Sequence, residues 1–165
     1  MKNLNINPLD VILAHKDFFD SFPTKKNFKN INLMGINLKG MNLIDINFDG
    51  ANLSGAIFEC SNMVNLSFAD TNLRGALFSG ANLKDVTLVR ANLMGANLMG
   101  ANLSGANFTH AYLPGSILEE ANLTDANFTG ANLTGANIKN ADLRNIDITG
   151  AKIDGVRFEK ARNFK

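Results

Sequence analysis

The chain has 165 residues, with 16 Lys+Arg, 15 Asp+Glu, two His and one Cys, and its formal net charge is +1. This composition excludes a globally basic nucleic-acid-binding protein, a disulfide framework and a cysteine-rich zinc site. No apolar run approaches the roughly 20 residues of a membrane helix. Because the first residues also lack the apolar stretch of a secretory signal, we expect a cytoplasmic protein that does not associate with membranes.

Residues 1–25 are expected to form an N-terminal cap built on a short α-helix. Asn7 suits the N-cap position, Pro8 suits the first helical position, and Pro23 ends the helix. The apolar residues between them would cover the first layer of the following region. A solvent-exposed helix and a helix that lies on a membrane surface are the alternatives.

A five-residue repeat occupies residues 26–160 without interruption. These residues divide into 27 units, and the central residue of every unit is Leu, Phe, Ile or Met. The residue two before the centre is usually Ala, and the residue before the centre is usually Asn. All 14 glycines lie two residues after a centre, as in residues 101–105, which read Ala-Asn-Leu-Ser-Gly. The repeat indicates one structural unit used many times.

A period of five fits neither an α-helix nor a flat strand, since successive centres would leave any one buried face. A turn at each Gly position would restore the direction, because Gly, Asn and Asp tolerate positive φ at the third residue of a type II turn. Some units have other residues in this position, and we expect a different turn type there. These residues are Arg90, His110, Glu120 and Lys160.

The phenylalanines indicate how many units complete one layer. The eight central phenylalanines fall into two groups with spacings of 20 residues or multiples of 20, and the groups are offset by 10: Phe28, Phe48, Phe68, Phe108 and Phe128 form one, and Phe58, Phe78 and Phe158 the other. Four units therefore make one square coil, with Ala and the central residue inside. We expect about seven coils, stacked at the ~4.8 Å spacing of β-strands.

The unit Ala-Asn-Leu-x-Gly resembles the pattern of the pentapeptide repeat family, Ala-Asp/Asn-Leu-x-x, over about four-fifths of the chain. The resemblance implies an all-β fold, a right-handed quadrilateral β-helix, and only the hand rests on the resemblance alone. It also implies one candidate function, because some family members protect DNA gyrase by imitating DNA.

The C-terminal tail, residues 161–165, is too short to cover a four-sided end. We therefore expect a second copy to close the C-terminal coil, which would give a tail-to-tail homodimer.

A candidate protein-interaction face follows from the exceptions among the outward positions. Ile57, Leu77 and Ile117 replace the usual Asn, and all three belong to one column of the square coil. Met99 is expected on the same wall, and Tyr112 also points outward. Residues 91–118 contain no Asp, Glu, Lys or Arg, so this surface is typical of a partner-binding region. Ordinary substitution of surface Asn residues is the alternative.

Nothing in the sequence indicates catalysis, a cofactor or a metal. The pair His110 and Tyr112 lacks a carboxylate partner, Cys60 lies at a corner without basic neighbours, and the glycines serve turns rather than a phosphate loop.

We expect a non-enzymatic protein-binding scaffold. A gyrase-directed DNA mimic is the alternative, but the repeat region has 11 Lys+Arg and 12 Asp+Glu, a balance of −1, and no projecting loop. Direct binding of nucleic acid is not expected.

Overall fold

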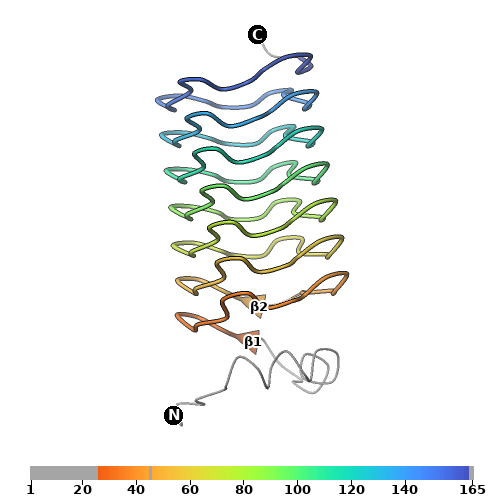
Figure 1. Cartoon of the computed structure of the whole chain (residues 1–165), viewed down its shortest axis with the longest axis vertical. Coiled ribbons are helices and arrows are strands. Elements are labelled where there is room, and N and C mark those ends of the chain that lie inside the picture. Colours follow the sequence, from red (N-terminus) through yellow and green to blue (C-terminus); the bar gives the residue numbers. More distant parts are fainter. Residues whose placement is uncertain (1–25, 45, 164–165) are drawn as a thin grey trace.

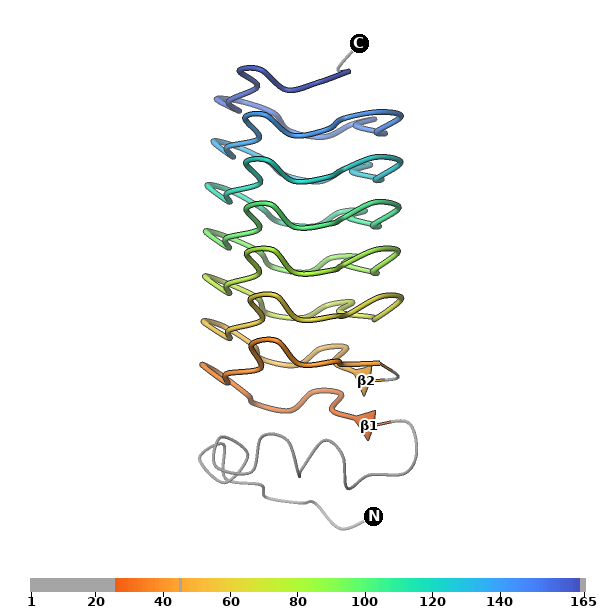
Figure 2. The same ribbon diagram turned by 90° about the vertical axis from the view of Figure 1, so that its right-hand side faces the viewer.

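The computed structural model describes residues 26–44 and 46–163, which form a straight stack of four-sided coils. The chain climbs from one coil to the next in the same sense, and the coils lie directly above one another in both side views (Figures 1 and 2). The proposed cap helix of residues 1–25 lies outside the described residues. No helix in the described ranges is long and apolar enough to cross a membrane.

Parallel pairing between residues 20 positions apart holds the stack together. Strand β1, Lys26–Asn27, pairs with strand β2, Ile46–Asn47, in parallel, and Asn27 lies opposite Asn47. Above them each unit contributes a single bridge to the unit 20 residues later, for example Asn102↔Asn122. Every such bridge joins the outward position before one centre to the same position one coil above. The predicted square coil of four units is therefore confirmed.

Each unit repeats one set of backbone hydrogen bonds. The Leu103 amide donates to the Asn122 carbonyl at 2.8 Å, and the Gly105 amide donates to the Thr124 carbonyl at 2.9 Å, so both bonds reach the coil above. The Ala106 amide donates back to the Leu103 carbonyl at 3.0 Å and closes the turn between two walls. Because the bonds of one coil fix the corners of the next, the rod is tied along its whole length.

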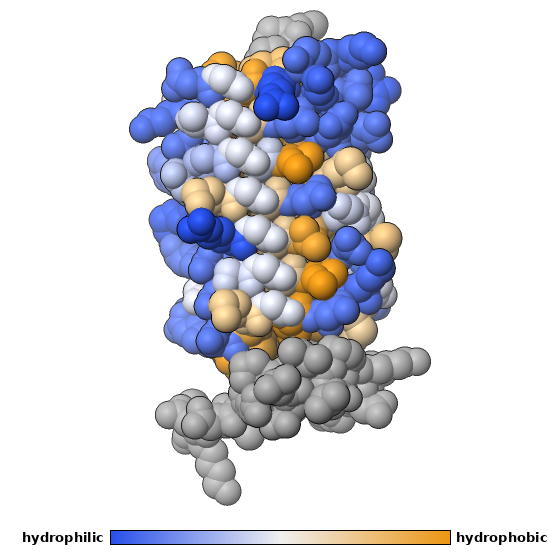
Figure 3. Space-filling view, in the orientation of Figure 1, coloured by the Kyte–Doolittle hydropathy of each residue, from blue (hydrophilic) through white to orange (hydrophobic). Residues whose placement is uncertain are grey.

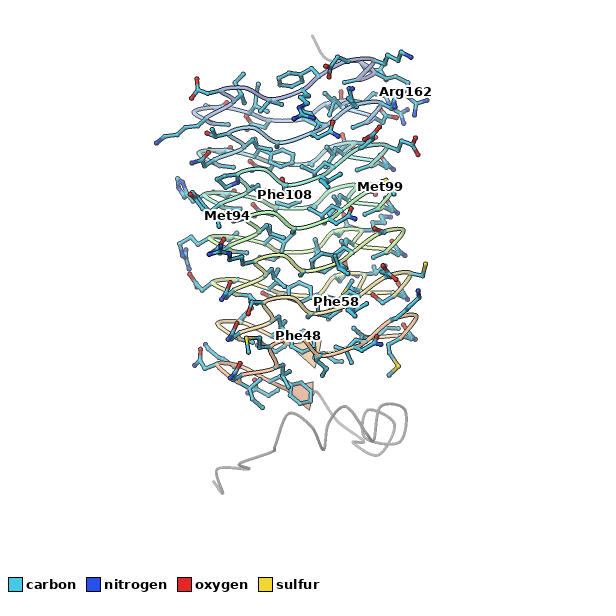
Figure 4. The ribbon with its side chains drawn as sticks, in the orientation of Figure 1. Phe48, Phe58, Met94, Met99, Phe108 and Arg162 are labelled. Carbon is cyan, nitrogen blue, oxygen red and sulfur yellow. The ribbon has the colours of Figure 1, made fainter. Side chains whose placement is uncertain are left out.

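The interior is filled as the repeat predicts. Every central residue from Phe28 to Leu143 is buried, and so are the alanines two positions earlier from Ala51 to Ala141. Phe48 lies parallel to Phe68 with ring centroids 5.4 Å apart, and Phe58 lies parallel to Phe78 at 4.9 Å. Rings from the two groups also meet edge to face, which is a favoured aromatic geometry. Figure 4 labels Phe48 and Phe58, whose rings lie inside the stack.

The corners correct one expectation. Positive φ occurs at every described Gly and also at the four corners for which another turn type was expected: Arg90 (55°), His110 (56°), Glu120 (60°) and Lys160 (57°). The physical reason is the ladder. The Arg90 amide donates to the Thr109 carbonyl of the next coil, and the Ala91 amide closes the turn onto the Leu88 carbonyl. These hydrogen bonds hold the corner residue in the left-handed conformation, although this conformation is strained for a residue other than glycine.

Candidate protein-interaction surface

Two adjacent walls carry the candidate face. The strip wall contains Ile57, Leu77 and Ile117, and the tyrosine wall contains Tyr112. The corner between these walls is the glycine edge, since glycine occupies it in every coil, at positions 35, 55, 75, 95, 115, 135 and 155.

The three aliphatic residues of the strip wall form one column, as expected. Ile57 is bridged to Leu77, and Asn97 separates Leu77 from Ile117. Stacking along the column covers the lower members, so Ile57 and Leu77 are half-buried, whereas Ile117 is 37% exposed. The column is therefore a shallow apolar strip whose most accessible part lies around Ile117.

Met99 and Tyr112 extend the accessible apolar area. Met99 lies two residues beyond Asn97 on the strip wall and is 45% exposed. Tyr112 is bridged to Asn92 and Asn132, so it belongs to the neighbouring wall rather than to the strip column, and it is 44% exposed. The structure thus brings all five predicted residues to two walls that meet at the glycine edge. Figure 3 shows apolar side chains beside a column of near-neutral hydropathy on this side of the rod.

Charged groups border this surface at both ends. Below it, Lys39 forms an ion pair with Glu59 at 2.7 Å, and the hydrogen bond from Lys39 to that carboxylate raises the pKa of the lysine. Above it, the Glu119 carboxylate accepts a hydrogen bond from the Asn137 amide at 2.9 Å. The centre of the surface contains no ion pair because residues 91–118 include no Asp, Glu, Lys or Arg.

His110 has a structural place at its corner. A side chain at Gly130, one coil above, would collide with the His110 imidazole, so the two residues are matched in size. No group of three metal-binding side chains occurs among the described residues. The apolar hollow near the last coils has a volume of about 10 Å³, far below the roughly 300 Å³ of a small-molecule site.

The glycine edge was not recognised from the sequence, although its signal was present. Sorting the corners by the 20-residue period places seven of the 14 glycines in one column.

Two protein-family models match most of the chain. A family model described as a pentapeptide repeat region matches residues 24–98, and one described as pentapeptide repeats in eight copies matches residues 101–140 and 126–162. No curated protein matches the chain.

Solved structures of repeat proteins are similar to the chain. A trypsin-treated variant of QnrB1, a plasmid-mediated fluoroquinolone resistance protein, has a TM-score of 0.50 at 24% identity; the match covers 78% of this chain and 63% of that one. HetL, a pentapeptide repeat protein involved in heterocyst differentiation regulation from the cyanobacterium Nostoc, has a TM-score of 0.37 at 23% identity, and the match covers 89% of this chain and 93% of HetL. The chain thus spans less than two thirds of the QnrB1 structure, and the likeness to QnrB1 concerns the fold.

Proposed function

The chain belongs to the pentapeptide repeat family, whose members form right-handed quadrilateral β-helices, and we propose that it is a non-enzymatic scaffold that presents flat walls to a protein partner. The observation that carries this proposal is the accessible, uncharged apolar surface around Ile117 on an otherwise polar rod. Such a surface favours association because its apolar area leaves water when a partner covers it.

The rigidity of the rod supports the same proposal. Backbone hydrogen bonds join every described coil to its neighbour, so the outward side chains keep a fixed spacing and little ordering entropy is lost on binding. Among the described residues, four of the six large hydrophobic side chains that are exposed lie on the two walls of the candidate face: Met34, Met99, Tyr112 and Ile117.

A direct test compares partner capture by the wild type and by a Leu77→Asp/Ile117→Asp variant. The matched control carries Thr87→Asp and Asn127→Asp, which place the same charges in the same slots of the opposite wall, where Asp147 already occurs. We expect the strip variant to lose the partner and the control to keep it, with both variants folded by circular dichroism. Equal capture by both variants would show that the partner does not bind the strip wall.

The gyrase-directed alternative has less support. A DNA mimic needs a strongly negative rod, whereas the repeat region has a balance of −1 and no projecting loop. QnrB1 is a fluoroquinolone resistance protein, and its likeness to this chain concerns the fold. We expect no rescue of gyrase supercoiling when the protein is added with a quinolone, and dose-dependent rescue would reverse this ranking.

The tail-to-tail homodimer is also a proposal. Ile153, an inward centre near the C-terminal end of the stack, is 39% exposed, and Ile146, Ile148 and Val156 beside it are only partly buried. A charged side chain at Ile153 should prevent this apolar contact, so the dimer should dissociate and the mass in solution should halve. Sedimentation of the wild type and of an Ile153→Asp variant measures this, and identical masses would contradict the contact.

A further inference from the structure

The outward position before each centre changes character near the C-terminal end of the stack. From Asn27 to Asn137 every residue at this position is uncharged, and Asn is the most frequent. The next five are all charged: Asp142, Asp147, Lys152, Arg157 and Arg162. Residues at this position are bridged to the same position in the adjacent coils, so a neutral coil stacked on top would cover these charges without pairing them. We name residues 146–163 the end coil.

The end coil also carries backbone groups that the lower coils would pair. In a lower coil the amides of the centre and the corner donate to the coil above, and the carbonyl two residues before the centre accepts from it, as at Leu103, Gly105 and Ala101. Among the described residues, the equivalent groups of the end coil have no partner: the amides of Ile148, Gly150, Ile153 and Gly155, and the carbonyls of Ile146, Ala151 and Val156. Such an edge pairs readily with a strand of another chain.

The climb of the chain restricts how two such ends can meet. One coil rises by the strand spacing over four walls, so each unit lies about 1.2 Å above the preceding one and the end coil is a ramp (Figures 1 and 2). Two ramps related by a two-fold axis meet evenly on every wall only if the axis passes through the corner halfway along the end coil. That corner is at Gly155. Residues 151–155 of one copy then lie opposite residues 156–160 of the second copy.

We propose that a second copy covers the end coil in one register, in which the two-fold axis passes through the corner at Gly155 and two pairs of opposite charge form reciprocally. Lys152 lies opposite Glu159 of the second copy, and Asp154 lies opposite Arg157 of the second copy. This inference rests on the tail-to-tail homodimer proposed above, and it adds the orientation of the two rods and the residues that select it.

Backbone and apolar groups match in the same register. The axis is perpendicular to the rod, so the facing strands run antiparallel. The Gly155 amide then faces the Val156 carbonyl of the second copy, which pairs a donor with an acceptor at the corner. Ile153, which is 39% exposed, faces Phe158 of the second copy, so apolar centres of the two end coils cover each other.

Charge distinguishes this register from its competitors. The four side chains of the proposed pairs are exposed, and none of them has an ion pair among the described residues. An antiparallel register displaced by two residues would place Lys152 opposite Arg157 of the second copy, which is a like-charge contact. Parallel stacking of the first coil of a second copy would place Asn32 above Lys152 and leave the charge unpaired. Complementary charges of this kind fix the register of an interface.

Reversal of one charge at a time, followed by mixing, tests the pairs. Lys152→Glu and Glu159→Lys should each weaken dimerisation at least tenfold in sedimentation, because each places two like-charge contacts in the dimer. An equimolar mixture of the two variants should dimerise as tightly as the wild type, since both contacts of the mixed dimer are again of opposite sign. Arg74→Glu is the control: it makes the same charge change on the same wall, in a lower coil, and should leave the dimer unchanged.

The outcomes separate this inference from the homodimer on which it rests. A wild type that sediments as a monomer would overturn both. A wild-type dimer whose Lys152→Glu variant behaves like the Arg74→Glu control, or dimerises more tightly, would overturn the register alone, and so would a mixture that stays monomeric while each variant is folded by circular dichroism. Assemblies that grow beyond the dimer with concentration would show open-ended parallel stacking instead.

Discussion

At the scale of single residues, Ser116 departs from the packing rule of the interior. It occupies an inward position, is fully buried, and its hydroxyl has no hydrogen-bond partner. The other two inward hydroxyls are satisfied: Ser61 donates to the Phe58 carbonyl at 2.6 Å, and Thr71 donates to the Phe48 carbonyl at 2.9 Å. A buried hydroxyl without a partner has lost its water and gained nothing in return.

Replacing Ser116 by Ala should stabilise the protein. Alanine fills the equivalent inward positions at Ala96 and Ala136, and removing the unpaired hydroxyl should raise the free energy of unfolding by about 1 kcal/mol. The matched control, Ser61→Ala, removes a satisfied hydroxyl and should lower it by about 1 kcal/mol. Urea denaturation measures both, and a lower midpoint for Ser116→Ala would show that its hydroxyl has a partner in solution.

The ion pair between Arg90 and Asp70 makes a second prediction. Arg90 Nε and Nη2 donate to the two Asp70 carboxylate oxygens at 2.6 and 2.7 Å, and these bonds lower the pKa of Asp70. A carboxyl with a lowered folded-state pKa contributes stability above its unfolded pKa, and this contribution is lost as the pH falls through the folded value. Arg90→Gln should therefore raise the pKa of Asp70 towards its ordinary value, as measured by NMR titration. An unchanged pKa would show that the pair does not persist in water.

At the scale of the structural element, each wall is a ladder of identical positions. Phe108 stacks on Phe128, one coil above it, with ring centroids 4.5 Å apart and an interplanar angle of 4°. The 20-residue spacing predicted this stacking, because one coil of the square helix returns the chain to the same wall. The corner turn was predicted only in part, since the left-handed conformation at Arg90 follows from hydrogen bonds to neighbouring coils and not from the residue type.

Removing one ring should show how much the phenylalanine ladder contributes to the free energy of unfolding. Phe108→Ala leaves a cavity inside a fully buried stack and should lower the free energy of unfolding by about 3–5 kcal/mol. Phe108→Leu should lower it less, because Leu88 already fills the position below in the same column. Met99→Ala, on the outside of the rod, is the control and should change stability by less than ~0.5 kcal/mol. A small effect of Phe108→Ala in urea denaturation would contradict the packed ladder.

At the scale of the whole molecule, stability depends more on register, which sets the wall on which each unit lies, than on chain length. Deleting residues 91–110 removes one complete coil and leaves every later residue on its own wall. Deleting residues 101–105 moves every later unit to the neighbouring wall, so that Phe128 no longer lies in the column of Phe68 and the strip column is broken.

We therefore expect the shorter deletion to cause the greater loss. The variant without residues 91–110 should unfold cooperatively near the wild-type midpoint, and the variant without residues 101–105 should unfold at a clearly lower temperature. Thermal denaturation followed by circular dichroism compares them. The reverse order would mean that the apolar centres are interchangeable between walls.

The sequence by itself determined the coil, because a central apolar residue at every fifth position and rings at every twentieth leave one arrangement that buries them all. It also placed Ile57, Leu77 and Ile117 in one column, since column membership follows from counting. Only the tertiary structure decided how much of each side chain remains accessible, because Ile57 and Leu77 are covered by the residues stacked above and below them. It also decided which corners have room for a side chain, because the space around a corner depends on the side chains of adjacent coils.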